Sequence, residues 1–284
     1  MAQVDTWARL ITDSELYFEI PEDLRDIYEA EAGAGFNPAV YLIYCPVNER
    51  KRRPLSEKLL YILNDVLIYL EREREGIRRR SFAAGDIRVL ETGFVLLDSW
   101  MVLAGKSGEE LETVTIYYNR VVAGFFEELT RRMRMLALGY SDPPEYDNSL
   151  SQQMQKASYK YMNYTRNIIF VNEGFLKHAY QPLVMGRKFK IFRAAITNEH
   201  MLVLTREELI QLTEGRGFID RYGRTNTFFF RRFIERAELS EIGETGRARL
   251  NVYSGGYVRS VIFDQTTKVT AADLISHVTP RRAS

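Results

Sequence analysis

Alternating hydrophobic and polar residues run through most of the chain and predict a protein built largely of antiparallel strands. In the first half the pattern predicts strands at 40–46, 57–63, 66–71, 81–90, 94–103 and 112–118, with turns at Asn64-Asp65, Thr92-Gly93 and 105–108. From Val121 to Leu136 the apolar residues recur at helical spacing instead. The first half is therefore expected to be a run of strands closed by one amphipathic helix.

The chain start has a different pattern. Residues 1–35 are expected to form a helical N-terminal extension, whose second helix opens at Pro21 and closes at Gly33. Proline is tolerated at the first position of a helix, and glycine commonly follows the last. The first strand-rich domain is then expected to cover residues 36–139.

The second half repeats this order of elements over residues 174–284. Strands at 188–197 and 201–205 are expected to form a hairpin through Asn198-Glu199, followed by strands at 227–234, 248–253 and 258–264 and a closing helix from Thr270. Residues 62–73 align without gaps on residues 196–207, with five identities. This match predicts a duplicated domain.

Between the halves, residues 140–173 are expected to form a linker and an amphipathic connecting helix. The prolines in 140–147 would break a helix there. Residues 150–171 carry an apolar seam at heptad spacing, which includes Met154, Tyr161, Tyr164 and Ile168. We interpret the seam as a helix that lies across both domains. The alternative is self-association, which would make the protein a homo-oligomer through this helix.

The order of elements and one short segment resemble a known family. Ile-Thr-Asn-Glu-His-Met-Leu-Val-Leu-Thr at 196–205 is similar to the early hairpin segment of bacterial pleckstrin-homology-like (PH-like) domains, although His200 stands where an Arg is common. The first copy keeps Asn64 but has Leu63 and Val66 in place of the Thr and the Arg. The resemblance implies an α+β fold with two antiparallel PH-like β-barrels, each closed by a C-terminal amphipathic helix.

The composition limits the range of functions. Lys plus Arg, 39 residues, nearly balances Asp plus Glu, 38 residues, so no overall field attracts nucleic acid, and we do not favour it as a partner. No stretch has the length and apolarity of a membrane span or a signal peptide, so a cytoplasmic protein is expected. The single cysteine, Cys45, is expected in the core.

Candidate chemistry is sparse. The three histidines, His178, His200 and His277, have no partners at metal-ligand spacing, and the glycine-rich segments lack the context of phosphate loops. We therefore expect no cofactor, no metal and no catalytic site, although an enzyme with a non-local site is a weaker alternative.

The basic clusters are the main candidate site. Arg50, Lys51, Arg52 and Arg53 fall between the first two strands, where many eukaryotic PH domains hold anionic lipid headgroups, and Arg187, Lys188 and Lys190 recur in a similar place. The preferred hypothesis is a non-enzymatic scaffold that binds a protein partner through a strand edge or loops. The alternative is a peripheral binder of anionic membrane lipids.

Overall fold

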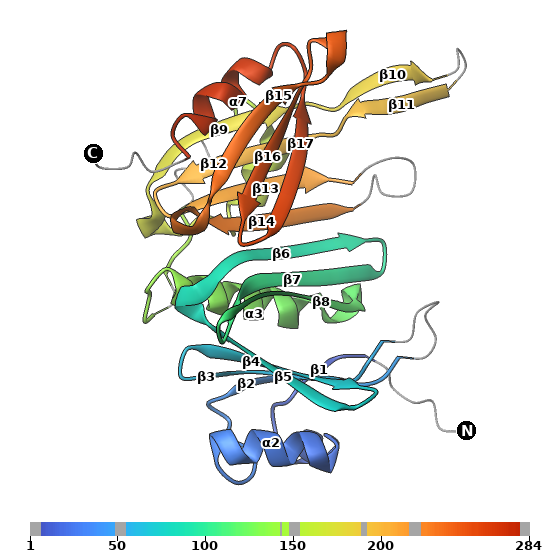
Figure 1. Ribbon diagram of the computed structural model, residues 1–284, viewed down its shortest axis with the longest axis vertical. Helices are drawn as coiled ribbons and strands as arrows, with labels where there is room; N and C mark the ends of the chain where they lie inside the picture. Colours follow the sequence, from blue (N-terminus) through green and yellow to red (C-terminus); the bar gives the residue numbers. More distant parts are fainter. Residues whose placement is uncertain are drawn as a thin grey trace.

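The computed structural model describes residues 7–48, 55–142, 144–147, 154–188, 192–215 and 223–278. It confirms an α+β fold of antiparallel sheets with few helices (Figure 1). No closed barrel is present in this part of the chain. No helix within the same ranges has the length and apolarity needed to cross a membrane.

The first half contains a five-stranded sheet and then three further strands. The sheet consists of β1 (Arg9–Leu10), β2 (Tyr41–Cys45), β3 (Lys58–Leu63), β4 (Val66–Glu73) and β5 (Gly76–Ala83), in that order. After the short 3-10 turn η1 (Ala84–Asp86) follow β6 (Ile87–Val95), β7 (Asp98–Ser107) and β8 (Glu110–Asn119). The turn η2 (Arg120–Val122) leads into helix α3 (Ala123–Ala137), the predicted closing helix.

The second half follows the same order. It begins with two long strands, each with one break. The first consists of β9 (Phe175–Gln181) and β10 (Val184–Lys188), and the second of β11 (Phe192–Thr197) and β12 (His200–Thr205). They are followed by β13 (Glu208–Glu214) and β14 (Arg224–Phe230), and after η4 (Arg231–Phe233) by β15 (Arg236–Glu241), β16 (Ala248–Ser254) and β17 (Tyr257–Phe263). The turn η5 (Gly243–Thr245) separates β15 from β16, and α7 (Lys268–Ile275) closes the half.

The predicted hairpin through Asn198-Glu199 is wrong. Strand β12 pairs with β9 and β13, and β11 pairs with β10. In the first half Asn64 and Asp65 have φ angles of 49° and 62°, which a tight hairpin needs, whereas Asn198 and Glu199 are not among the described residues with positive φ. The pattern therefore forms a hairpin turn at Asn64-Asp65 in the first half, but its second copy at Asn198-Glu199 only separates β11 from β12.

The turn predicted at Thr92-Gly93 is also wrong, because both residues lie inside β6. The chain reverses at Leu96-Leu97, between β6 and β7, where Leu96 has a φ of 55°. Gly93 opposes Trp100 in β7, and a Cβ at Gly93 would lie only 2.2 Å from the indole Cζ2. The glycine thus serves close packing inside a strand, not a turn.

The N-terminal segment is part of the first half rather than an appendage to it. Strand β1 extends the sheet, and helices α1 (Ser14–Phe18) and α2 (Glu22–Ala32) cover its outer face, with α2 at the bottom of Figure 1. Tyr17, Leu24 and Tyr28 are fully buried there against sheet residues that include Tyr61 and Leu70. The predicted limits of the second helix, Pro21 and Gly33, are confirmed as its caps.

The connecting helix predicted over 150–171 is much shorter in the described part of the chain. Only α5 (Tyr159–Thr165) is α-helical, and the 3-10 turn η3 (Val171–Glu173) follows. Met154, Tyr161 and Ile168 are buried in the main core, and Tyr164 packs against it. The side chains of the predicted self-association seam thus pack within their own chain, as expected if the segment connects the two halves.

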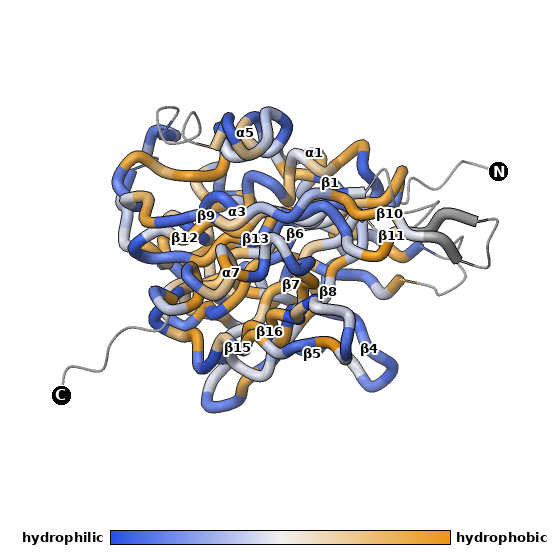
Figure 2. The backbone as a smooth tube through the Cα atoms, turned by 90° about the horizontal axis from the view of Figure 1, so that it is seen from above, coloured by the Kyte–Doolittle hydropathy of each residue, from blue (hydrophilic) through white to orange (hydrophobic). Residues whose placement is uncertain are grey.

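The two halves share one sheet. Strand β6 of the first half pairs with β14 of the second, giving the seven-stranded order β8-β7-β6-β14-β13-β12-β9 (Figure 1). One face of this sheet packs into a core with α3 and the first sheet, and the other packs against β15–β17 and α7. Seen from above in Figure 2, hydrophobic stretches concentrate in inner strands such as β13, and hydrophilic ones in outer turns such as that between β4 and β5.

Candidate binding cleft between the two halves

A cleft of about 400 Å³ lies where the two halves meet. Strands β6 and β14 form its floor, and helices α3 and α5 form its walls together with Tyr146 from the linker. Thr92 and Asn226 are direct partners across the β6–β14 ladder, and Arg224 opposes Phe94 on the same pair of strands. Because alternate residues of a strand face the same side, Arg224, Asn226 and Phe228 all project from β14 into this face.

Arg224 is the unusual residue of the cleft. Its Nε is buried without a hydrogen-bond partner, and no hydrogen bond or ion pair of this side chain is found among the described residues. Its Cζ lies 4.5 Å from the ring centroid of Tyr164 and 5.8 Å from that of Phe94. Burial lowers the pKa of Arg224 from its usual value, but a guanidinium stays charged at neutral pH.

Asn226 supplies a second unused group. Its Oδ1 is buried and has no hydrogen-bond partner in the described part of the chain. Buried polar atoms are nearly always hydrogen-bonded, because an unpaired one loses its water contacts without compensation. The floor of the cleft therefore presents both a free guanidinium donor and a free amide acceptor.

The deep end of the cleft is closed by a buried ion network. Arg134 of α3 donates to Glu208 of β13 at 3.1 and 2.5 Å, to Glu173 at 3.0 Å and to the carbonyl of Ile168 at 2.9 Å. Its Cζ lies 4.6 Å from the ring centroid of Phe170 and 4.0 Å from that of Phe228. Burial, and next the Glu208 carboxylate, raises the pKa of Glu173 well above its usual value. The network ties α3 to the second half.

The acidic residues on the α3 wall are already paired. Glu128 accepts from Arg131 at 2.6 and 2.7 Å and from Arg132 at 2.7 Å, and Glu127 accepts from Arg120 at 2.9 Å. The hydrogen bond from Arg131, the largest cause, lowers the pKa of Glu128. These pairs leave Arg224 as the cation of the cleft that makes no ion pair among the described residues, although the Glu127 and Glu214 carboxylates act on it from a longer distance.

The opposite face of the β6–β14 joint is locked by Glu91. This buried carboxylate accepts from Trp100 at 3.0 Å, from Thr227 and Tyr257 at 2.8 Å each, and from Arg259 Nε at 2.6 Å; it also bonds the second nitrogen of Arg259. The donors come from β7, β14 and β17, so one side chain joins both halves. The floor of the cleft is thus fixed in position from behind.

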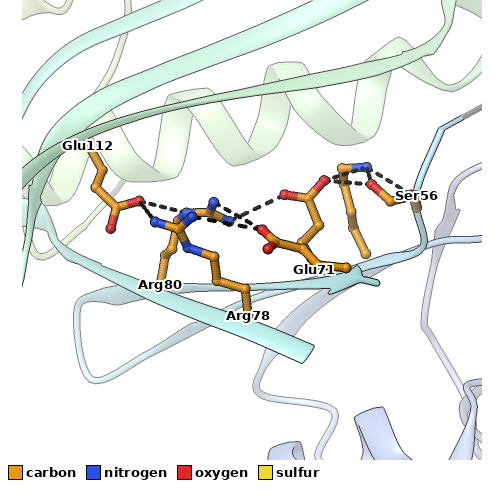
Figure 3. A network of polar contacts seen from close by, with 7 residues as sticks. Ser56, Glu71, Arg78, Arg80 and Glu112 are labelled. Carbon is orange, nitrogen blue, oxygen red and sulfur yellow. Dashed lines mark hydrogen bonds and ion pairs between the residues drawn. The ribbon is translucent and has the colours of Figure 1, made fainter. Parts of the chain in front are cut away.

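A second polar cluster in the first half is structural. Figure 3 shows Arg78 and Arg80 facing Glu112 on one side, while Arg80 also reaches Glu71, which accepts from Ser56 at 2.5 Å. Lys58 and Glu73 complete it, giving three cations and three carboxylates. Because its charges balance, the cluster stabilises the contact between β5 and β8 and leaves no charge to bind a ligand.

The structure places the sequence-predicted residues as follows. Arg50, Lys51, Arg52, Arg53 and Lys190 lie outside the described residues, and Arg187 and Lys188 lie in β10. Tyr164 and Ile168 line the cleft. Cys45 is buried, and burial raises the pKa of its thiol to about 12. Within the described ranges no group of three or more metal-ligating side chains comes together.

Sequence reasoning missed Arg224, Asn226 and Arg134. The only local signal is the run Arg-Thr-Asn-Thr-Phe at 224–228, where polar residues occupy the same strand face as a core phenylalanine. Comparison with known proteins adds nothing to this reading: no protein-family model matches the chain, and no curated protein matches it.

Proposed function

We propose that the chain is a non-enzymatic interaction module made of two PH-like units, and that the cleft between them takes up a segment of a protein partner. After β1, both halves have the order of four strands, three strands and a helix, if β9 with β10 and β11 with β12 each count as one interrupted strand. This order supports the likeness to PH-like domains. A fixed pairing of the units through β6 and β14 creates a binding surface that neither unit has alone.

The observation that carries the proposal is the cleft itself. The network around Arg134 holds the α3 wall and Glu91 holds the floor, yet Arg224 and Asn226 on that floor keep unused hydrogen-bonding groups. Preorganised sites bind more tightly because less conformational freedom is lost on binding. A rigid cleft with free polar groups is typical of recognition.

The membrane alternative keeps one supporting observation. In Figure 1 the β10–β11 hairpin and the β6–β7 turn extend toward the same side of the molecule. Arg187 and Lys188 lie in β10, and Leu96 and Leu97 at the β6–β7 turn are 60% and 64% exposed. Co-sedimentation with acidic and neutral vesicles tests this alternative, using a variant with Arg50, Lys51, Arg52 and Arg53 changed to Ser. Binding that needs acidic lipid and these four residues would favour it.

The interaction proposal is tested by site-specific photo-crosslinking. A photoreactive benzoyl-phenylalanine at Asn167, which is exposed on the cleft wall, should capture a partner from an extract of the source cells. The same group at Ser240, exposed on β15, should not capture that species. Capture of one species from both positions would contradict the cleft as the site.

A variant that fills the cleft, compared with a matched control, gives a stricter test. Gly124 of α3 lines the cleft and has open space around its Cβ position, so Gly124→Trp should fill the cleft without displacing the backbone. Gly85 has equally open space but does not line the cleft, so Gly85→Trp is the matched control. We expect the crosslink from position 167 to disappear in the first variant only. Its persistence in Gly124→Trp would reject the proposal.

A further inference from the structure

We infer that the cleft recognises an acidic side chain, and that Arg224 is the residue that binds its carboxylate. This inference rests on the proposed function, because it names the chemistry of the group that the partner segment brings. Three features of the described residues support it: the unpaired guanidinium, the unpaired acceptor two residues later, and the compensated charges around them.

The guanidinium of Arg224 is held ready for a planar anion. The Tyr164 ring lies 4.5 Å from its Cζ, and the Tyr164 hydroxyl donates to Glu214 at 3.1 Å, while Lys160 bonds Glu214 at 3.0 Å. The supporting ring is therefore itself fixed. A guanidinium presents its donors in a rigid fork that matches the two oxygens of a carboxylate. Ring contacts leave these N–H donors unused.

Asn226 distinguishes a peptide from a simple anion. Its free Oδ1 needs a donor, and Asn226 projects from the same face of β14 as Arg224, two residues along, which spaces their Cα atoms by roughly 7 Å. An Asp or Glu residue in an extended segment carries a carboxylate and backbone N–H groups within such a span. Inorganic phosphate in its dianionic form has one P–OH donor, but this donor and its acceptor oxygens sit on one small tetrahedral group and cannot span the two residues. The pair of free groups therefore favours an acidic peptide segment.

Electrostatics point to the same ligand class. Glu127 and Glu128 are engaged by arginines of their own helix region, and the charge of Arg134 is met by Glu173 and Glu208. An incoming carboxylate thus meets one free cation rather than competing for a paired one. It also supplies the ion-pair contact that the Arg224 guanidinium, which the Glu127 and Glu214 carboxylates reach only from a longer distance, lacks in the described part of the chain.

The test is an NMR titration that observes the Nε–Hε signal of Arg224, assigned by its loss in Arg224→Lys. The probes are the capped peptides acetyl-Ala-Asp-Ala-amide and acetyl-Ala-Asn-Ala-amide, which differ only in the charged group. We expect the Asp peptide to shift the signal in a saturable way and the Asn peptide to bind about tenfold more weakly, as expected for a charge-assisted hydrogen bond. Equal binding of both peptides would overturn the inference.

Two variants separate binding from folding. Arg224→Gln should abolish the peptide-dependent shifts of cleft backbone amides while its spectrum stays dispersed. Asn226→Asp should place an internal carboxylate beside Arg224 and weaken the Asp peptide at least about tenfold. Unchanged affinity in either folded variant would overturn the inference, as would a response to inorganic phosphate without one to the Asp peptide. A crosslink at position 167 with no peptide response would reject the inference alone. The absence of any crosslink from position 167 in the chain with an unfilled cleft, or its persistence in Gly124→Trp, would reject the proposed function.

Discussion

Two glutamates and one arginine, Glu173, Glu208 and Arg134, meet in the buried joint between the halves. One guanidinium cannot neutralise two carboxylates, so burial favours a proton on Glu173, and its pKa is raised. The folded chain then holds this proton more tightly than the unfolded chain. Glu173 therefore contributes stability that is fully present below its unfolded pKa and is lost as the pH rises through its folded pKa.

The variant Glu173→Gln should remove this pH dependence. The amide keeps an oxygen that accepts from Arg134 and needs no proton to stay neutral. Between the two pKa values the variant should gain about 1.4 kcal/mol per pH unit in its free energy of unfolding relative to the wild type. Urea unfolding from pH 5 to pH 8 measures the difference. Parallel stability curves for the two proteins would contradict the shifted Glu173.

Glu128→Gln is a control of opposite sign. The pKa of Glu128 is lowered, chiefly by its hydrogen bond from Arg131, so its stabilising effect is present above the unfolded pKa and is lost as the pH falls through the folded pKa. This variant should therefore lose about 0.5 kcal/mol at neutral pH and nothing in acid.

At the scale of single elements, local sequence patterns predicted much of the structure. The caps of α2, the Asn64-Asp65 turn and the apolar stripe of α3 each depend on residues near one another in the chain, and all three are confirmed. The cleft could not be predicted in this way. Glu91 and Thr227 are 136 positions apart, and no local spacing indicates that their strands pair.

Gly93 shows how an element can be misread from residue type alone. A glycine in a polar setting is typical of a turn, but here the indole of Trp100 covers the Cα. The Trp100 Nε1 donates to Glu91, so ring and carboxylate hold each other in place. The strand therefore requires a residue without a side chain at position 93, so that the Trp100 ring can lie there.

Gly93→Ala should lower the free energy of unfolding by about 1 to 3 kcal/mol, the usual cost of overpacking, since the Trp100 ring must move. Gly85→Ala, where no atom lies within 4 Å of the added Cβ, should change it by about 0.5 kcal/mol or less. Urea unfolding followed by tryptophan fluorescence measures both. Equal stability of the two variants would show that the ring does not pack as described.

At the scale of the whole molecule, the halves share hydrogen bonds and cores that the duplicated sequence pattern did not predict. Val89 and Ala104 of the first half belong to the core of the second, and Phe228 of the second belongs to the core of the first. The linker between the halves therefore divides the sequence without separating two independent cores.

We therefore expect the chain to unfold as one unit. Fragments 1–139 and 154–284 should each lack the sharp unfolding transition of the full chain, because each exposes half of the β6–β14 joint. Circular dichroism during urea unfolding tests the full chain and both fragments. A cooperative transition in either isolated fragment, at a midpoint close to that of the full chain, would contradict shared stability.

The β6–β14 joint is a head-to-tail contact, since it joins the first of three strands in one half to the fourth strand of the next. A contact of this kind joins two unlike surfaces. Repeated between molecules, it would build a closed ring or an open fibre. The corresponding outer strand of the second half is β15, which pairs only with β16 in the described ranges. The face of β6 that carries Val89, Glu91 and Gly93 is buried. On β15, by contrast, the face that carries Arg236, Glu238 and Ser240 is exposed. The exposed polar face of β15 therefore offers no apolar surface on which the sheet edge of another unit could pack as β14 packs beside β6.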